Sequence, residues 1–204
     1  MPFYVKVGKV PPKRHITFYK EDGKSLYREE LFSTKGFSGI YSNKYHLYMP
    51  PQVEKISEVS IDSSENDWND APVEYYHFIT DKKQNKGNIL TSRNEFLKND
   101  HCVISTAHIT EDTDIFYRNS QMHEIVFVHH GKGLLLSEYG KIKFDEWDYL
   151  IIPKGTTYQL KFDDYKNNKV FIIESDTPYE IPSHFRNEYG QLTEEAPYYE
   201  RDFR

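Results

Sequence analysis

Short apolar runs separated by turn residues recur through the second half of the chain. They are HCVISTAH (101–108), HEIVFV (123–128), GLLLSE (133–138), DYLIIP (148–153) and KVFIIE (169–174). The turn signals between them recur about every eight to twelve residues, a spacing typical of β-sandwiches and barrels. Because the apolar runs do not alternate cleanly with polar residues, we expect several of these strands to be covered on both faces. The pattern predicts an all-β domain from residue 101 onward.

The first hundred residues are less regular and predict a β extension. The candidate strands are FYVKV (3–7), ITFYK (16–20), SLYREELF (25–32), VEKISEVSI (53–61) and VEYYHFIT (73–80), and STKGFSGIYSNKYH (33–46) is expected to be an ordered loop. One short helix is predicted from Ser92, because the SRNE segment has the form of a capping box with Glu95 and is followed by EFLKND. We therefore expect an N-terminal β extension with a connector helix over 1–100, a barrel over 101–180 and a connector over 181–204.

The last segment, 181–204, combines aromatic residues with prolines and charges and shows no periodicity. A compact domain has no need of such a tail. We expect an apolar patch near Tyr198, Tyr199 and Phe203 that packs on a second domain or another subunit.

Composition narrows the function classes. The chain holds 17 Tyr and 13 Phe, which favour pleated, half-buried surfaces, and its net charge is −6, which disfavours nucleic-acid binding. No apolar run is long enough to span a bilayer, and the N-terminus lacks the apolar stretch of a secretory signal. A single cysteine excludes an internal disulfide framework. These features predict a soluble cytoplasmic protein that contacts neither nucleic acid nor membrane.

Two short patterns, Glu124-x6-Gly131 and Pro153-x-Gly155-x2-Tyr158, resemble the paired motifs of cupin barrels. In metal-binding cupins the first motif also contains a His-x-His pair, and the second ends in histidine, a ligand set that suits Fe(II). Here the pair should fall within 117–120, which reads Tyr-Arg-Asn-Ser, and the last position is Tyr158. One ligand of four remains. The sequence therefore predicts no metal site and no catalytic residue in this barrel, and leaves Glu124 and Tyr158 as candidate pocket residues.

Longer segments resemble the N-terminal half of homogentisate 1,2-dioxygenases. They are the run from Gly8 to His46 with its PPKRH and GFSG blocks, the barrel segment 119–160, and 182–203, which ends in Arg-Asp-Phe. The resemblance implies a cupin-like jelly-roll barrel or β-sandwich in a family that opens the homogentisate ring with O2 at Fe(II), in tyrosine and phenylalanine breakdown. It also implies assembly into trimers and hexamers. Family members are nearly twice this length, and their iron ligands lie in a C-terminal barrel that has no counterpart here.

Three hypotheses remain open at this point. The chain is the non-metal-binding half of a homogentisate dioxygenase-like enzyme, inactive without the missing catalytic domain and with no cofactor of its own. Alternatively, it is a free-standing, metal-free cupin that binds a small molecule or serves as an oligomerisation module. The third hypothesis is a metalloenzyme with a non-standard ligand set that joins Glu124 to distant histidines.

Overall fold

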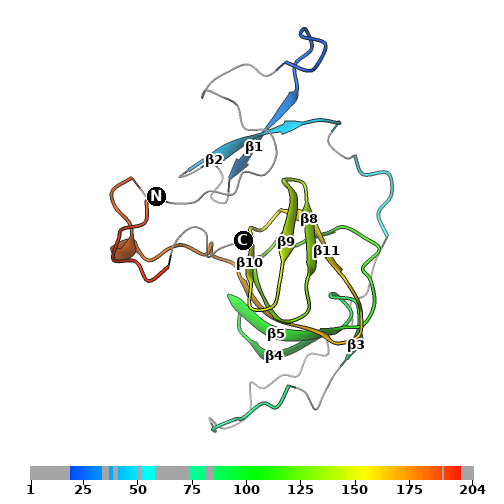
Figure 1. Cartoon of the computed structure of the whole chain (residues 1–204), viewed down its shortest axis with the longest axis vertical. Coiled ribbons are helices and arrows are strands. Elements are labelled where there is room, and N and C mark those ends of the chain that lie inside the picture. Colours follow the sequence, from blue (N-terminus) through cyan, green and yellow to red (C-terminus); the bar gives the residue numbers. More distant parts are fainter. Residues whose placement is uncertain are drawn as a thin grey trace. The chain divides into compact units, whose positions relative to one another are not determined.

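The computed structural model describes residues 19–33, 37–38, 41–49, 52–57, 74–80, 85–189 and 191–198. The chain forms two compact units, one made of residues 9–75 and the other of residues 1–8 and 76–204. Each has its own sheets, and Figure 1 labels the strands. No helix within the described ranges is long and apolar enough to cross a membrane.

The smaller unit contains a two-stranded antiparallel sheet. Strand β1 (Arg28–Ser33) pairs with β2 (Tyr41–His46) in a register that sets Arg28 opposite His46. Glu30 accepts a hydrogen bond from His46 Nε2 at 2.6 Å, which joins the two strands across one face. The strand predicted over 25–32 is confirmed in β1. The loop predicted over 33–46 is wrong in its second part, since 41–46 forms a strand.

The larger unit is built from two sheets that together form the barrel (Figure 1). The first sheet has the order β10-β7-β12-β5-β3, with β4 also paired to β5. Its strands are β3 (Lys86–Gly87), β4 (Arg93–Lys98), β5 (Cys102–Ile109), β7 (His123–His130), β10 (Tyr149–Ile152) and β12 (Asn168–Ser175). The second sheet has the order β6-β11-β8-β9. Its strands are β6 (Tyr117–Arg118), β8 (Gly133–Ser137), β9 (Gly140–Phe144) and β11 (Thr157–Phe162).

The core lies between these two sheets. The first sheet contributes Val126, Val128, Leu150, Val170 and Ile172, all of which are buried, and the second contributes Leu135, Phe144, Tyr158, Leu160 and Phe162. Strand β12 shows how the sequence specifies this arrangement. Its residues alternate between buried and partly exposed along its whole length, as the two-residue period of a strand requires. All-β, cupin-like architecture is therefore confirmed, and so are the four strands predicted between residues 123 and 174.

The predicted helix from Ser92 is wrong. Residues Arg93–Lys98 form strand β4, which pairs antiparallel with β5 across a register shift between Glu95 and Leu97. The Ser92 hydroxyl does not cap a helix but donates to the Asn88 carbonyl at 2.7 Å. Pairing with β5 outweighs the local signal, because a capping box followed by so few residues leaves a helix too short to be stable alone. Strands β3 and β4 thus lie in the barrel sheet, although both fall within the range 1–100 assigned to the extension.

Two other strands predicted in the first hundred residues are not formed in their described parts. The strand predicted over 73–80 is wrong for 74–80, which has no strand pairing. Residues 53–57 of the segment predicted over 53–61 also form no strand, and the rest of that segment lies outside the described residues. The strand over 3–7 and most of 16–20 lie outside them too. In the tail, a short 3-10 helix, η1 (Ser183–Phe185), is followed by a bridge between Arg186 and Leu192.

The two motif glycines occupy turns that need them. Gly131 has a φ of 108°, and an added Cβ would overlap the Asn168 side chain. Gly155 has a φ of 83°, and its amide donates to the Asn119 carbonyl at 2.7 Å. Both positions lie in the region of backbone space that side chains disfavour. The two motifs therefore specify turns of the barrel whether or not a metal is held between them.

Candidate functional site

The two candidate pocket residues meet inside the barrel. Glu124 lies on β7 and Tyr158 on β11, so they come from different sheets, and each is 1% exposed. The Tyr158 hydroxyl donates to Glu124 Oε2 at 2.9 Å. The sequence motifs therefore single out two side chains that contact each other in the core.

A guanidinium group completes the environment of Glu124. Arg93, at the start of β4, directs Nη2 at Glu124 Oε1 with a separation of 2.7 Å. Its Nη1 lies 3.1 Å from Glu174 Oε2, and its Nε donates to the Ile89 carbonyl at 3.3 Å. Only 13% of the arginine side chain is exposed, so these are charge-assisted contacts in a largely dry environment. Arg93 bridges two carboxylates that would otherwise repel each other.

Asn119 supports the second carboxylate. Its Nδ2 donates to Glu174 Oε1 at 2.8 Å. Its Oδ1 accepts hydrogen bonds from the amides of Gln121 and Met122, at 3.1 and 2.9 Å. The amide side chain is therefore fixed by the loop that precedes β7, and both of its ends are used.

Tyr117 closes the cluster from the side of β6. Its ring centroid lies 5.6 Å from the Arg93 guanidinium carbon, within cation–π distance. The same ring meets the Tyr158 ring edge to face, at 5.7 Å between centroids. The interior cluster, as we name it, consists of Arg93, Tyr117, Asn119, Glu124, Tyr158 and Glu174.

Burial and charge act against each other in this cluster. Burial alone would lower the pKa of Arg93, but the negative charges around it, first that of Glu124, raise it above its ordinary value, so the guanidinium stays charged. Burial raises the pKa of Glu174 above its usual range, and the charge of Arg93 offsets only part of that effect. Burial also raises the pKa of Tyr117 to about 12. Burial raises the pKa of Tyr158 as well, so both tyrosines are neutral, and Glu174 keeps a proton to higher pH than an ordinary glutamate does.

The residues of the interior cluster do not fit a transition metal. Both oxygens of Glu124 are engaged, one by Arg93 and one by Tyr158. No group of three or more His, Cys, Asp or Glu side chains in the described part of the chain is arranged to hold a metal ion. A positively charged guanidinium beside the carboxylates also opposes the entry of a divalent cation. The carboxylate oxygens of Glu124 and Glu174 instead bind the Arg93 guanidinium.

His123 is adjacent to Glu124 in the sequence but makes contacts outside the interior cluster. His123 is 2% exposed, and its Nδ1 accepts a hydrogen bond from the Lys154 amide at 3.2 Å. Its ring packs edge to face on Tyr179, at 6.4 Å between centroids. Burial, with a smaller contribution from Lys154, lowers the pKa of His123, which keeps the imidazole neutral. His123, the first residue of β7, thus contacts Lys154 and Tyr179 and does not join Glu124 in the interior cluster.

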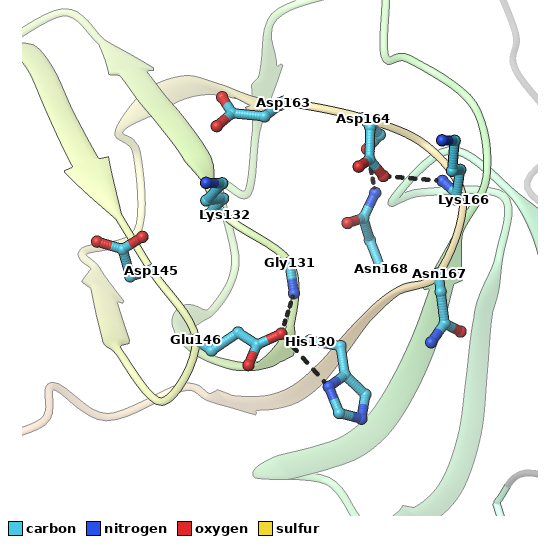
Figure 2. Close-up of a pocket in the computed structure, with 10 residues that line it drawn as sticks. All are labelled: His130, Gly131, Lys132, Asp145, Glu146, Asp163, Asp164, Lys166, Asn167 and Asn168. Carbon is cyan, nitrogen blue, oxygen red and sulfur yellow. Dashed lines mark hydrogen bonds and ion pairs between the residues drawn. The ribbon is translucent and has the colours of Figure 1, made fainter.

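A polar cavity of about 590 Å³ lies between the loops that follow β7, β9 and β11 (Figure 2). None of its lining residues belongs to the interior cluster. Its lining includes four carboxylates, two lysines and His130, which lies 3.5 Å from Glu146. Glu146 also accepts a hydrogen bond from the Gly131 amide at 3.3 Å, and Asp164 accepts one from the Lys166 amide at 3.1 Å. These contacts hold the ends of loops, and the cavity contains neither Glu124 nor Tyr158.

Sequence reasoning missed Arg93 and Glu174. A period-two reading of KVFIIE would have placed Glu174 on the same face as Val170 and Ile172, inside the barrel. Arg93 had no comparable signal, because it lies in the segment misread as a helix and reaches Glu124 only through the pairing of β4 with β5. Tyr117 and Asn119 were recognised only as residues in place of histidines.

Comparisons with known proteins add two findings. No family model matches the chain. A curated protein of Saccharolobus solfataricus, named "Putative dioxygenase SSO1533", is 42% identical over 205 residues, which cover 100% of this chain and 52% of the relative. The chain therefore spans about half the length of the curated relative it matches, and it is similar to part of a protein named as a dioxygenase.

Solved structures with partial similarity include several cupins. A cupin-2 domain protein of Shewanella frigidimarina aligns with a TM-score of 0.36 and 15% identity, over 41% of this chain and 79% of that one. A protein of Bacillus halodurans aligns with a TM-score of 0.42 and 18% identity, over 55% of this chain and 87% of that one. The scores are low, so the cupin-like assignment relies on the strand order and the two motif turns described above.

Proposed function

We propose that this chain is the metal-free scaffold half of a homogentisate 1,2-dioxygenase-like enzyme, which opens an aromatic ring with O2 at Fe(II) held by a separate catalytic barrel. The observation that carries the proposal is the 42% identity over the whole chain to about half of a protein named as a dioxygenase. The interior cluster supports it, because carboxylates that are fully hydrogen-bonded serve a scaffold better than a reaction centre.

Aromatic side chains on the outer face of the first sheet support an interface with a second domain or subunit. Phe171 on β12 lies directly opposite Phe127 on β7, and both point away from the core. The Phe127 ring lies 4.7 Å from Tyr149 and 6.0 Å from Trp147, and these last two side chains are 49% and 64% exposed. An aromatic surface of this kind is typical of the central part of a protein interface. We assign it to the catalytic barrel or to another subunit of a homo-oligomer.

Oxygen uptake with homogentisate tests the proposal. The purified 204-residue chain, supplied with Fe(II) under reducing conditions, should consume no O2. Co-expression with the unmatched half of the Saccharolobus solfataricus relative should restore uptake, because that half would supply the iron ligands. Ring cleavage by this chain alone would refute the scaffold assignment, and absence of activity in the combined protein would refute the substrate class.

The alternative is a free-standing, metal-free cupin that acts as an oligomerisation module. The aromatic outer face favours it, since a second copy of the chain could cover the same surface. Light scattering coupled to gel filtration measures the oligomeric state and distinguishes the scaffold-half hypothesis from this alternative. A stable oligomer that is unaffected by the added half would favour the alternative.

A further inference from the structure

The interior cluster contains the residues at the motif positions where a metal-binding cupin is expected to have its ligands. The positions that the two motifs reserve for ligands correspond to Tyr117, Asn119, Glu124 and Tyr158, and all four side chains belong to the cluster. None is an imidazole. The side chains at the four motif positions therefore converge in this barrel, but their donor atoms are not those of a metal-binding cupin.

Arg93 reaches the point on which these side chains converge. Its guanidinium contacts the carboxylates of Glu124 and Glu174 through different nitrogens and lies against the ring of Tyr117. The planar fork of five donors suits two carboxylates at once, which a point charge such as a lysine ammonium does not. The cation comes from β4, a strand outside both motifs.

The charges around Arg93 leave the cluster dependent on this cation. With both carboxyl groups ionised, one positive charge faces two negative charges. Removal of the arginine would leave both carboxylates buried in the same space, with only the neutral donors Tyr158 and Asn119. Removal of one partner of a buried ion pair is strongly destabilising, because it leaves an uncompensated charge in the interior.

We propose that the Arg93 guanidinium is a built-in replacement for the metal ion of the cupin barrel, and that its site is a cation site specific for guanidinium. The proposal rests on the metal-free part of the proposed function and is independent of the reaction. It accounts for a barrel interior without histidine ligands at the motif positions, because the Arg93 side chain supplies a positive charge and also occupies the space beside Glu124.

Chemical rescue tests the proposal. Arg93→Ala removes the guanidinium and leaves space for N-ethylguanidinium, which supplies the atoms that the substitution deletes. We expect the melting temperature of the variant to rise with N-ethylguanidinium and to reach a plateau, as binding to the folded state requires. Ethylammonium at the same concentration carries the same charge without the fork and should produce a much smaller shift.

Two controls make the result specific. Arg118→Ala removes a guanidinium from β6, in the second sheet, where Nε donates to the Thr157 hydroxyl in an exposed position, and this variant should not be rescued. Equal stabilisation of both variants, or equal effects of the two cations, would overturn the proposal.

If Arg93→Ala does not fold, a Mn²⁺ titration of the unsubstituted chain tests the proposal instead. Saturable stabilisation by Mn²⁺ would overturn it, and the absence of any stabilisation would support it. Oxygen uptake is measured separately, so failure of the rescue leaves the reaction proposal to its own test.

Discussion

Glu174→Gln should remove part of the pH dependence of barrel stability. Burial, offset only in part by Arg93, raises the pKa of Glu174 above its ordinary value of 4.5. The folded protein therefore keeps a proton on this carboxyl to higher pH than the unfolded chain does. The stabilisation from this group is complete below the ordinary value and is lost as the pH rises through the raised one. The sign is thus a fall in stability with increasing pH.

The magnitude follows from linkage. One proton bound by the folded state and absent from the unfolded state changes the free energy of unfolding by at most about 1.4 kcal/mol per pH unit. Glutamine cannot ionise, and it keeps an oxygen that accepts from Asn119 in place of Glu174 Oε1. Glutamine also loses the ion pair with Arg93. Once Glu174 of the unsubstituted chain is ionised, that loss changes the free energy of unfolding of the variant by an amount that no longer depends on pH.

Urea unfolding between about pH 5 and pH 8 measures the effect. The difference in unfolding free energy, variant minus unsubstituted chain, should increase with pH across the lower part of this range and then level off. Glu111→Gln provides the matched control, because it makes the same chemical change at an exposed position of the same unit. A difference that stays constant, or that decreases with pH, would refute the reasoning about Glu174.

Three further substitutions test other parts of the account. His123→Gln should reduce the loss of stability below about pH 6.5, because a lowered pKa of His123 contributes stability that is present above the ordinary pKa and is lost as the pH falls. Thermal unfolding at several pH values measures this effect. A variant whose melting temperature falls with decreasing pH as steeply as that of the unsubstituted chain would contradict it. Gly155→Ala should cost about 1–2 kcal/mol from its positive φ alone, since the space around it is open. Gly131→Ala should cost more, because a Cβ there also meets Asn168, and equal losses in urea unfolding would show that the contact is unimportant.

The barrel could be predicted well because each of its strands carries its own local pattern. Strand β12 alternates between core and surface, and Gly131 and Gly155 mark turns whose conformation depends on few neighbours. Such signals are contained in a few consecutive residues. They were sufficient to identify the architecture and to name Glu124 and Tyr158 as candidate pocket residues.

The interior cluster could not be predicted in full, because it depends on pairing between distant segments. Arg93 contacts Glu124 across 31 positions of sequence and Glu174 across still more. Its segment satisfied a local helix rule, and only the hydrogen bonds of β4 to β5 bring it to the core. The cupin motifs specify only the positions of metal ligands, so they show which histidines are missing but not that Arg93, from outside the motifs, contacts Glu124.

We propose above that this barrel is a scaffold without a metal centre. The most direct measurement is the iron content of the purified 204-residue chain after anaerobic incubation with Fe(II) and removal of unbound metal. The account predicts iron far below one ion per chain, and a melting temperature that a chelator does not change. One tightly bound iron per chain, lost in Glu124→Gln, would contradict it.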